Sequence, residues 1–83
     1  MNRWVSANWI RWTIGDIWLV EVDDTYWEQH RAHCPPFLVV EVTANELPDG
    51  TERIVLLSVE TGDCPFFQPE HVARGVLLEG GLA

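Results

Sequence analysis

Three histidines and two cysteines are the residues of this chain whose types could bind a metal. His30, His33 and Cys34 are close neighbours, whereas Cys64 and His71 lie far along the chain. Two imidazoles and two thiolates form an acceptable ligand set for zinc. Zinc sites usually contain cysteines in Cys-x-x-Cys pairs, however, and this sequence has none. Because buried cysteine commonly acts as a small apolar residue, we predict no stoichiometric zinc and no other cofactor.

Carboxylates are the second group that could do chemistry. Asp23, Asp24 and Glu28 are near neighbours in sequence, as are Glu46 and Asp49. General acid–base catalysis needs a carboxyl group whose pKa has been adjusted and that is positioned beside the reacting proton. Acidic residues in turn-like segments are more often simply solvated, and neither a Ser-His-Asp order nor a phosphate-binding glycine loop is present. We therefore predict that the protein is not an enzyme.

From residue 15 onward the sequence predicts short strands separated by turns. In a strand from Ile17 to Val22, Trp18, Val20 and Val22 would share one face, with Glu21 on the other. In a strand from Phe37 to Thr43, Leu38, Val40 and Val42 would share one face. The Pro48-Asp49-Gly50 turn predicts a hairpin, because Pro presets φ and Gly accepts a positive φ. Arg53 to Val59 would return as the antiparallel partner. The residues expected to face inward are Trp18, Val20, Val22, Leu38, Val40, Val42, Val55, Leu57 and Val59.

The remaining segments give weaker signals. The polar stretch from Thr25 to Cys34 is interpreted as a long loop, and Glu60 to Asp63 as a second turn. We expect short strands at Phe66-Phe67 and at Val76 to Leu78, separated by a helical or 3₁₀ turn that starts at Pro69. The opening segment to residue 14 fits both helical and strand spacing. A strand is favoured there because Trp and Ile prefer sheets.

These elements predict one domain over residues 1–83 that is mainly β. The expected architecture is a small SH3-like barrel of about five antiparallel strands with one short helical turn, because closure protects strand edges in a short chain. Ile17, Leu19, Ile54 and Leu56 fall on the expected outward faces. Either the sheet bends so that both faces are covered, or an apolar patch remains for a partner.

Part of the chain resembles the MazF/PemK-type toxins. Gly15-Asp16 is followed by the apolar strand to Val22, then by Glu28-Gln29-His30-Arg31, and then by Pro36 and a Val-rich strand. Proteins of that family are SH3-like barrels that cut RNA. The resemblance covers residues 15–40 and implies the same barrel. It would also make Arg31 the residue that stabilises the transition state of RNA cleavage.

The charge of the chain favours a different activity. Thirteen acidic residues face five arginines and no lysine, which gives a formal charge of -8. Such a surface repels nucleic acid and attracts the basic patches of other proteins, whereas a surface that cuts RNA should attract phosphates. The five tryptophans exceed what so small a core usually needs, and tryptophan is enriched in protein interfaces.

We therefore expect a non-catalytic acidic protein that occupies a basic surface of a nucleic-acid-handling protein. In type it is similar to small acidic phage inhibitors of host defence, including anti-CRISPR proteins. The predicted partner-binding residues are four acids that steer association and two aromatic anchors: Glu21, Asp23, Asp24, Glu28, Tyr26 and Trp27. The alternatives are a divergent MazF/PemK-like endoribonuclease that uses Arg31, and a homo-oligomeric structural module in contact through outward apolar residues.

The location of the protein is predicted from what the sequence lacks. No apolar run reaches the length of a transmembrane helix, and the start, Met1 to Trp4, has no apolar core of a secretory signal. We therefore expect a cytoplasmic protein without membrane contact. In that compartment Cys34 and Cys64 would be reduced thiols, whereas in an oxidising compartment they could form one disulfide.

Overall fold

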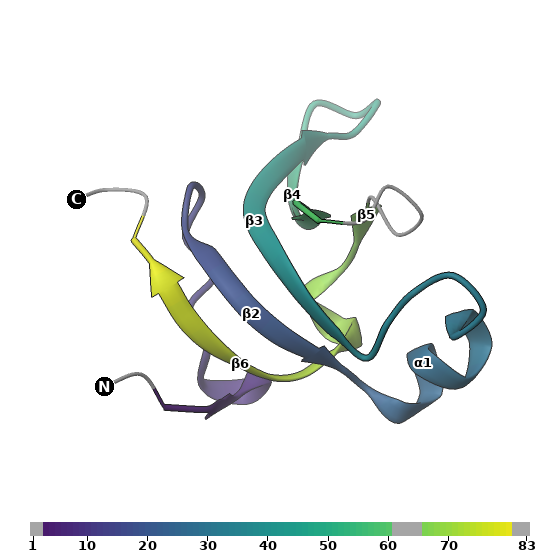
Figure 1. Ribbon diagram of the computed structural model, residues 1–83. Coiled ribbons are helices and arrows are strands. Elements are labelled where there is room, and N and C mark those ends of the chain that lie inside the picture. The colour runs from purple at the N-terminus through teal and green to yellow at the C-terminus, as the bar shows by residue number, and fades with distance from the viewer. Residues whose placement is uncertain (1–2, 61–65, 81–83) are drawn as a thin grey trace.

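A computed structural model describes residues 3–60 and 66–80, and its strands form one antiparallel sheet (Figure 1). The strand order is β1-β6-β2-β3-β4-β5. Along the chain the elements are β1 (Val5–Ser6), η1 (Ala7–Trp9), β2 (Ile17–Val22), α1 (Asp24–His30), β3 (Phe37–Glu46), β4 (Glu52–Ser58), β5 (Phe66–Phe67), η2 (Pro69–His71) and β6 (Val72–Glu79).

The topology is that of a small SH3-like barrel. β2 is central and pairs with both β3 and the last strand, β6, while β3, β4 and β5 follow one another as antiparallel neighbours. The 3₁₀ turn η2 starts at Pro69 and leads directly into β6, as the sequence predicts. The mainly β fold class is therefore confirmed. β1, which pairs with β6 through two residues only, is an addition to the five expected strands.

The alternating patterns of β2 and β3 place their apolar residues as predicted. Trp18, Val20 and Val22 are buried, and their sequence neighbours on β2 are only half-buried. On β3, Leu38, Val40 and Val42 are at most 1% exposed. These side chains enter one core with residues from β4, β5, β6 and the segment after α1: Trp18, Val20, Val22, Cys34, Leu38, Val40, Val42, Leu56, Phe67 and Val72.

The predicted hairpin joins β3 and β4. Gly50 has a φ of 89°, and its N–H donates to the Leu47 carbonyl oxygen at 2.9 Å. Asp49 also stabilises the turn, because its Oδ1 accepts hydrogen bonds from the backbone N–H and the hydroxyl of Thr51. A glycine at the position of positive φ and an aspartate that bonds two residues onward are both common features of turns.

The inward residues of β4 were predicted only in part, since Val55 is 6% exposed but Leu57 is half-buried and Val59 is 51% exposed. Leu56 pairs with Val42 and is 0% exposed, and Ile54 packs against the core from the same face. Leu57 pairs with Glu41 and lies on the outer face, so the sequence interpretation is wrong at this residue. The reason is that apolar residues occupy both faces of β4. Alternation alone then leaves the register undetermined, and the turn geometry and the pairing with β3 fix it.

The segment from Thr25 to Cys34 is not a long loop, because most of it forms α1. The Asp23 carboxylate caps the helix by accepting a hydrogen bond from the Tyr26 backbone N–H at 2.7 Å. Asp24 in the first turn and His30 in the last turn suit the helix dipole. The chain then returns to the barrel at Cys34, which is 1% exposed.

The opening segment is a strand only in part. Val5–Ser6 forms β1, Ala7–Trp9 forms η1, and Trp12 then packs on Trp18 with 5.5 Å between their ring centroids. The predicted turn from Glu60 to Asp63 extends outside the described residues, as does Cys64.

Candidate functional site: the outer apolar face

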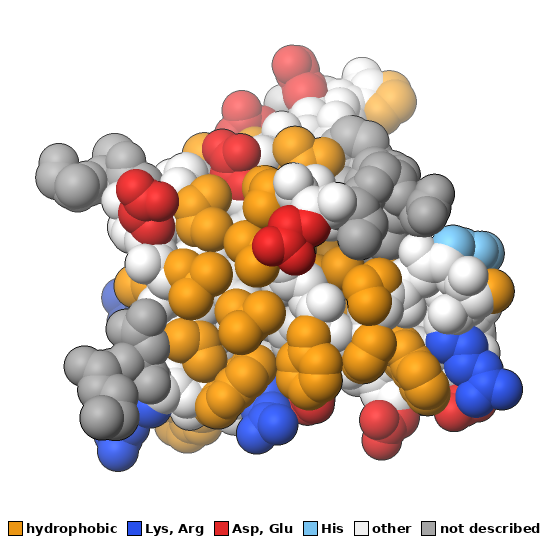
Figure 2. Space-filling view, in the orientation of Figure 1, with side chains coloured by type: hydrophobic (Ala, Val, Ile, Leu, Met, Phe, Trp, Pro, Cys, Tyr) orange, Lys and Arg blue, Asp and Glu red, His pale blue; other side chains and the backbone are white. Residues whose placement is uncertain are grey.

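The face of the sheet turned away from the core is also apolar. Outward side chains of β6, β2, β3 and the end of β4 form a continuous surface, which Figure 2 shows as the apolar area across the middle of the molecule. We call this surface the outer apolar face. It consists of Trp4, Ile17, Leu19, Phe37, Val39, Leu57, Val59 and Val76. Of these, Phe37 is 46% exposed and Val59 is 51% exposed, Leu19 and Val39 are half-buried, and Val76 is only 7% exposed.

One row of this face runs across the strands without a charge. Val76 pairs with Leu19, and Leu19 pairs with Val39. Val59 continues the row, because its N–H donates to the Val39 carbonyl oxygen at 3.0 Å. We call these four residues the central row.

Each neighbouring row of the face carries a carboxylate. On one side, Glu21 pairs with both Arg74 and Phe37. On the other side, Glu41 pairs with both Ile17 and Leu57. Since Glu41 is half-buried between apolar neighbours, the outer apolar face has carboxylates on both sides of the central row.

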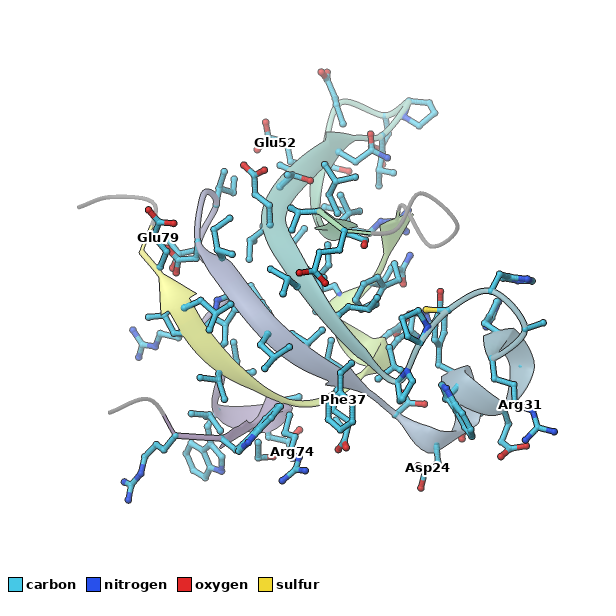
Figure 3. All side chains as sticks on the ribbon, viewed as in Figure 1. Asp24, Arg31, Phe37, Glu52, Arg74 and Glu79 are labelled. Carbon is cyan, nitrogen blue, oxygen red and sulfur yellow. The ribbon has the colours of Figure 1, made fainter. Side chains whose placement is uncertain are left out.

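A tryptophan and an arginine form one edge of the face. The Arg74 guanidinium lies 4.5 Å from the centroid of the Trp4 ring, and its Nε donates to the Glu21 carboxylate at 3.0 Å. Trp4 also meets Phe37 edge-on, with 6.1 Å between the ring centroids. Figure 3 shows Phe37 and Arg74 at this edge, whereas Asp24 and Arg31 lie away from it, around α1.

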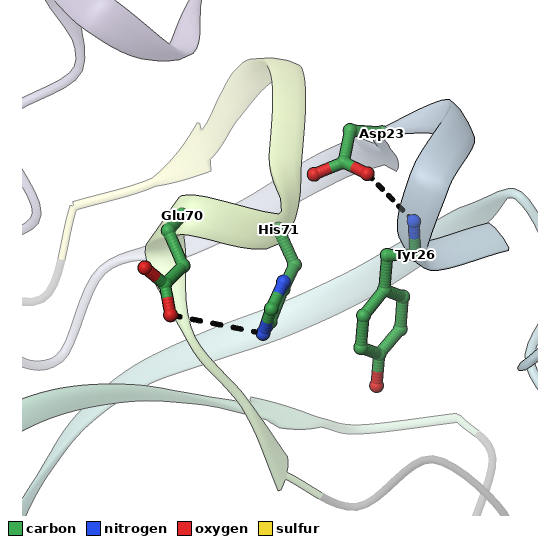
Figure 4. Close-up of polar contacts among 4 residues, drawn as sticks. All are labelled: Asp23, Tyr26, Glu70 and His71. Carbon is green, nitrogen blue, oxygen red and sulfur yellow. Dashed lines mark hydrogen bonds and ion pairs between the residues drawn. The ribbon is translucent and has the colours of Figure 1, made fainter. Parts of the chain in front are cut away.

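The six residues predicted to bind a partner do not form one surface. Glu21 is paired with Arg74, and Asp23 caps α1. The Tyr26 ring is stacked between His30 and His71, at centroid distances of 4.2 and 4.5 Å. Figure 4 shows Tyr26 beside His71, with the Asp23 cap and the contact between Glu70 and His71. Three of the six residues thus have structural contacts within the chain.

Trp27 also has a structural position, because it is half-buried against the core. The Arg31 guanidinium lies 5.6 Å from the centroid of its ring. Asp24 and Glu28 are exposed on α1 and are the two members of the predicted set available for long-range steering. That this set binds a partner stays a prediction.

The candidate metal ligands are only partly brought together. The His30 and His33 rings meet edge-on with 6.2 Å between their centroids, and His30 Nδ1 lies 3.0 Å from the Tyr26 carbonyl oxygen. His71 lies on the opposite side of Tyr26 from His30. Within residues 3–60 and 66–80, no group of three or more His, Cys, Asp or Glu side chains could hold a metal ion. Cys64 lies outside that part of the chain.

A second concentration of charge lies at the β3–β4 hairpin. Glu46 and Glu52 are directly opposite each other in the pairing, and Asp49 lies in the turn between them. Like charges in direct cross-strand positions are destabilising. The hydrogen bonds from the Thr51 hydroxyl and backbone N–H hold the pKa of Asp49 below its ordinary value of 3.8. All three carboxylates are exposed, so the hairpin presents negative charge to solvent.

A cleft of about 510 Å³ lies beside this hairpin. Val55 and Phe67 are its apolar lining, and Thr43, Asn45 and Arg53 are polar residues around it. The Arg53 guanidinium lies 3.1 Å from the Gln68 side-chain amide, whose oxygen accepts a hydrogen bond from it when the amide is turned toward the arginine.

Sequence reasoning identified only part of the outer apolar face. Ile17 and Leu19 were recognised as outward apolar residues, but Val39 and Val76 were not. The available signal was the unbroken apolar character of residues 37–40 and 76–78, which indicates strands with two apolar faces.

No protein-family model, characterised protein or solved structure matches this chain. In the described part of the chain, no helix has the length and apolar content needed to cross a membrane.

Proposed function

We propose that this chain is a non-catalytic binding protein that occupies a basic surface of a nucleic-acid-handling protein. The observation that carries the proposal is the outer apolar face, with carboxylates on both sides of its central row, in a chain with a formal charge of -8. A complementary partner offers apolar side chains bordered by arginine or lysine.

Apart from the buried Val76, the outer apolar face lies outside the core. Residues such as Val20, Val40 and Leu56 already fill the inner side of the sheet. Phe37 and Val59 nevertheless leave about half of their surface in water. Contiguous exposed apolar patches on soluble proteins commonly mark interaction sites. Association through this face would remove that surface from water, at roughly 25 cal/mol per Å² of apolar area.

The carboxylates restrict the kind of partner. Docking would remove Glu41 from water, and a buried carboxylate without a partner is costly. A cation from the partner beside Glu41 would offset this cost. The exposed acids around the barrel would also attract a basic partner over a Debye length of about 8 Å at physiological salt. They include Asp24, Glu28, Glu46, Asp49, Glu52, Glu60, Glu70 and Glu79.

Inhibition of a nucleic-acid-handling protein follows from the same chemistry. An acidic barrel seated in a groove that binds phosphates would exclude the nucleic acid by charge and by volume. An inhibitor of the anti-CRISPR type is one form of this activity. The small size of the chain and its excess of acidic residues support it.

A lysate capture with matched variants tests the proposal. The wild-type chain, a Val39→Lys variant and a Gln29→Lys variant would each be immobilised and exposed to the same lysate. Val39→Lys places a charge in the central row, whereas Gln29→Lys makes the same charge change at an exposed position on α1. We expect a nucleic-acid-binding protein to be retained by the wild type and by Gln29→Lys, and to be lost from Val39→Lys. Heparin, a polyanion, should release it.

Two results would contradict the proposal. Retention of the same proteins by all three chains would show that the outer apolar face is not the contact. RNA cleavage by the purified chain that is lost on Arg31→Ala would instead support the endoribonuclease alternative.

A further inference from the structure

We infer that the outer apolar face receives a basic amphipathic helix of the partner, which lies across the strands along the central row. This inference rests on the proposed function and adds the form of the partner segment. The central row runs through Val76, Leu19, Val39 and Val59, on three neighbouring strands and the residue that follows β4.

The dimensions of the sheet match a helix in this direction. Neighbouring strands are about 4.8 Å apart, so a row of four residues extends for about 14 Å. A helix rises about 1.5 Å per residue, so about ten residues cover that length. Successive outward residues on one strand are about 7 Å apart. Glu21 and Glu41, which lie one row to either side of the central row, are therefore about 14 Å apart along the strand direction. A helix about 10–12 Å wide fits between them.

The apolar central row matches the apolar face of such a helix, and the rows with carboxylates on either side match its basic residues. Apolar residues at positions i, i+3, i+4 and i+7 of the helix would pack on Leu19 and Val39. Arginine or lysine residues that border this stripe would meet Glu41 on one side, whereas Glu21 on the other side is already paired with Arg74. The Glu21 carboxylate already binds Arg74 through one oxygen, and a carboxylate can accept several further hydrogen bonds.

Charge decides between this occupant and a second copy of the chain. Two copies would each bring a formal charge of -8 to the contact. A basic helix neutralises the carboxylates that a second copy would place against each other. Trp4 and Phe37 meet edge-on along one side of the face, and aromatic residues of this kind commonly anchor interfaces.

A model peptide tests the inference directly. The probe is a fluorescently labelled peptide of about 14 residues, long enough to cover the row, with Leu at i, i+3, i+4 and i+7 and Lys elsewhere. One control has the same composition in scrambled order, and another has Glu in place of Lys. Fluorescence anisotropy at physiological salt should show that the ordered Lys peptide binds about tenfold or more tightly than either control, a difference of about 1.4 kcal/mol.

Two variants with the same charge change locate the peptide. Glu41→Gln removes one negative charge beside the central row, and Gln29→Lys adds one positive charge at an exposed position on α1. We expect Glu41→Gln to weaken binding about tenfold and Gln29→Lys to weaken it less than about twofold, because a contact charge counts for more than a distant screened one. Circular dichroism would verify that both variants keep the fold of the wild type.

Four other results would contradict the inference that a helix binds this face. Equal binding of ordered and scrambled peptides would show charge attraction without a helical stripe. Equal effects of Glu41→Gln and Gln29→Lys would place the peptide elsewhere. Self-association in sedimentation, abolished by Val39→Lys and unaffected by the peptide, would make a second copy the occupant. If a captured partner depends on Val39 but is not displaced by the peptide, the helix inference fails while the proposed function stands.

Discussion

Two adjacent leucines on β4 give the sharpest test of the fold. Leu56 is 0% exposed and pairs with Val42 toward the core, whereas Leu57 pairs with Glu41 on the outer apolar face. The substitutions Leu56→Ala and Leu57→Ala are chemically identical, and they lie next to each other in a single strand. Differences in strand propensity therefore largely cancel, and the comparison measures which face is the core.

The expected magnitudes differ because only one substitution leaves a cavity. Each removes three carbon atoms, worth about 0.8 kcal/mol each when fully buried, or roughly 2.4 kcal/mol. At Leu56 a cavity term of about 24 cal/mol per Å³ adds to this loss, for a total of about 3 kcal/mol. Leu57 is half-buried at the surface, where water can fill the space, so the loss there should be about 1 kcal/mol.

Urea unfolding followed by circular dichroism measures both values. With a slope of about 1 kcal/mol/M for a chain of this size, Leu56→Ala should lower the midpoint by about 3 M and Leu57→Ala by about 1 M. A larger effect of Leu57→Ala would mean that β4 has the register first expected from the sequence. Equal effects would mean that both faces are equally covered, and the outer apolar face would then not exist as described.

Two further predictions concern single hydrogen-bonded carboxylates. Asp23→Ala should lower the free energy of unfolding by about 1 kcal/mol because it removes the cap of α1, while Asp24→Ala should change it far less in the same urea titration. Thr51→Ala should raise the pKa of Asp49 toward 3.8 in a carboxyl NMR titration, and Thr25→Ala should leave it unchanged. Since the folded-state pKa of Asp49 is lowered, its contribution to stability is present above about pH 4 and is lost as the pH falls through the folded-state pKa.

The strands that could be predicted from the sequence are those with a strong pattern and a clear boundary. β2 begins after Gly15-Asp16 and ends at Val22, just before Asp23, and Glu21 marks its outward face. The β3–β4 hairpin was predictable because Pro48 presets its φ and Gly50 accepts a positive φ, both of which favour a turn. The faces of β4 were not, because Ile54 to Leu57 is apolar at every position and pairing across strands fixes its orientation.

α1 was missed for a different reason. Its seven residues contain polar and aromatic side chains without an apolar period, so nothing in the pattern predicts a helix. The signal was present in the cap, since aspartate at position 23 is a preferred residue before a helix start. Its aromatic residues pack toward the chain itself, with Tyr26 between two imidazoles and Trp27 against the core. Aromatic content alone could not distinguish an interface anchor from a residue that docks a short helix.

The acidic charge determines which partners the outer apolar face can bind. A sheet with two apolar faces would tend to associate with copies of itself, since only one face is covered by the core. A formal charge of -8 on every copy opposes that association. The same charge attracts a partner of opposite sign. The Glu41 carboxylate beside the central row forms no ion pair with any residue in 3–60 or 66–80, which favours a partner that brings a cation. A neutral barrel with this sheet would bind apolar surfaces without discrimination, whereas the acidic residues make basic partners the favoured ones.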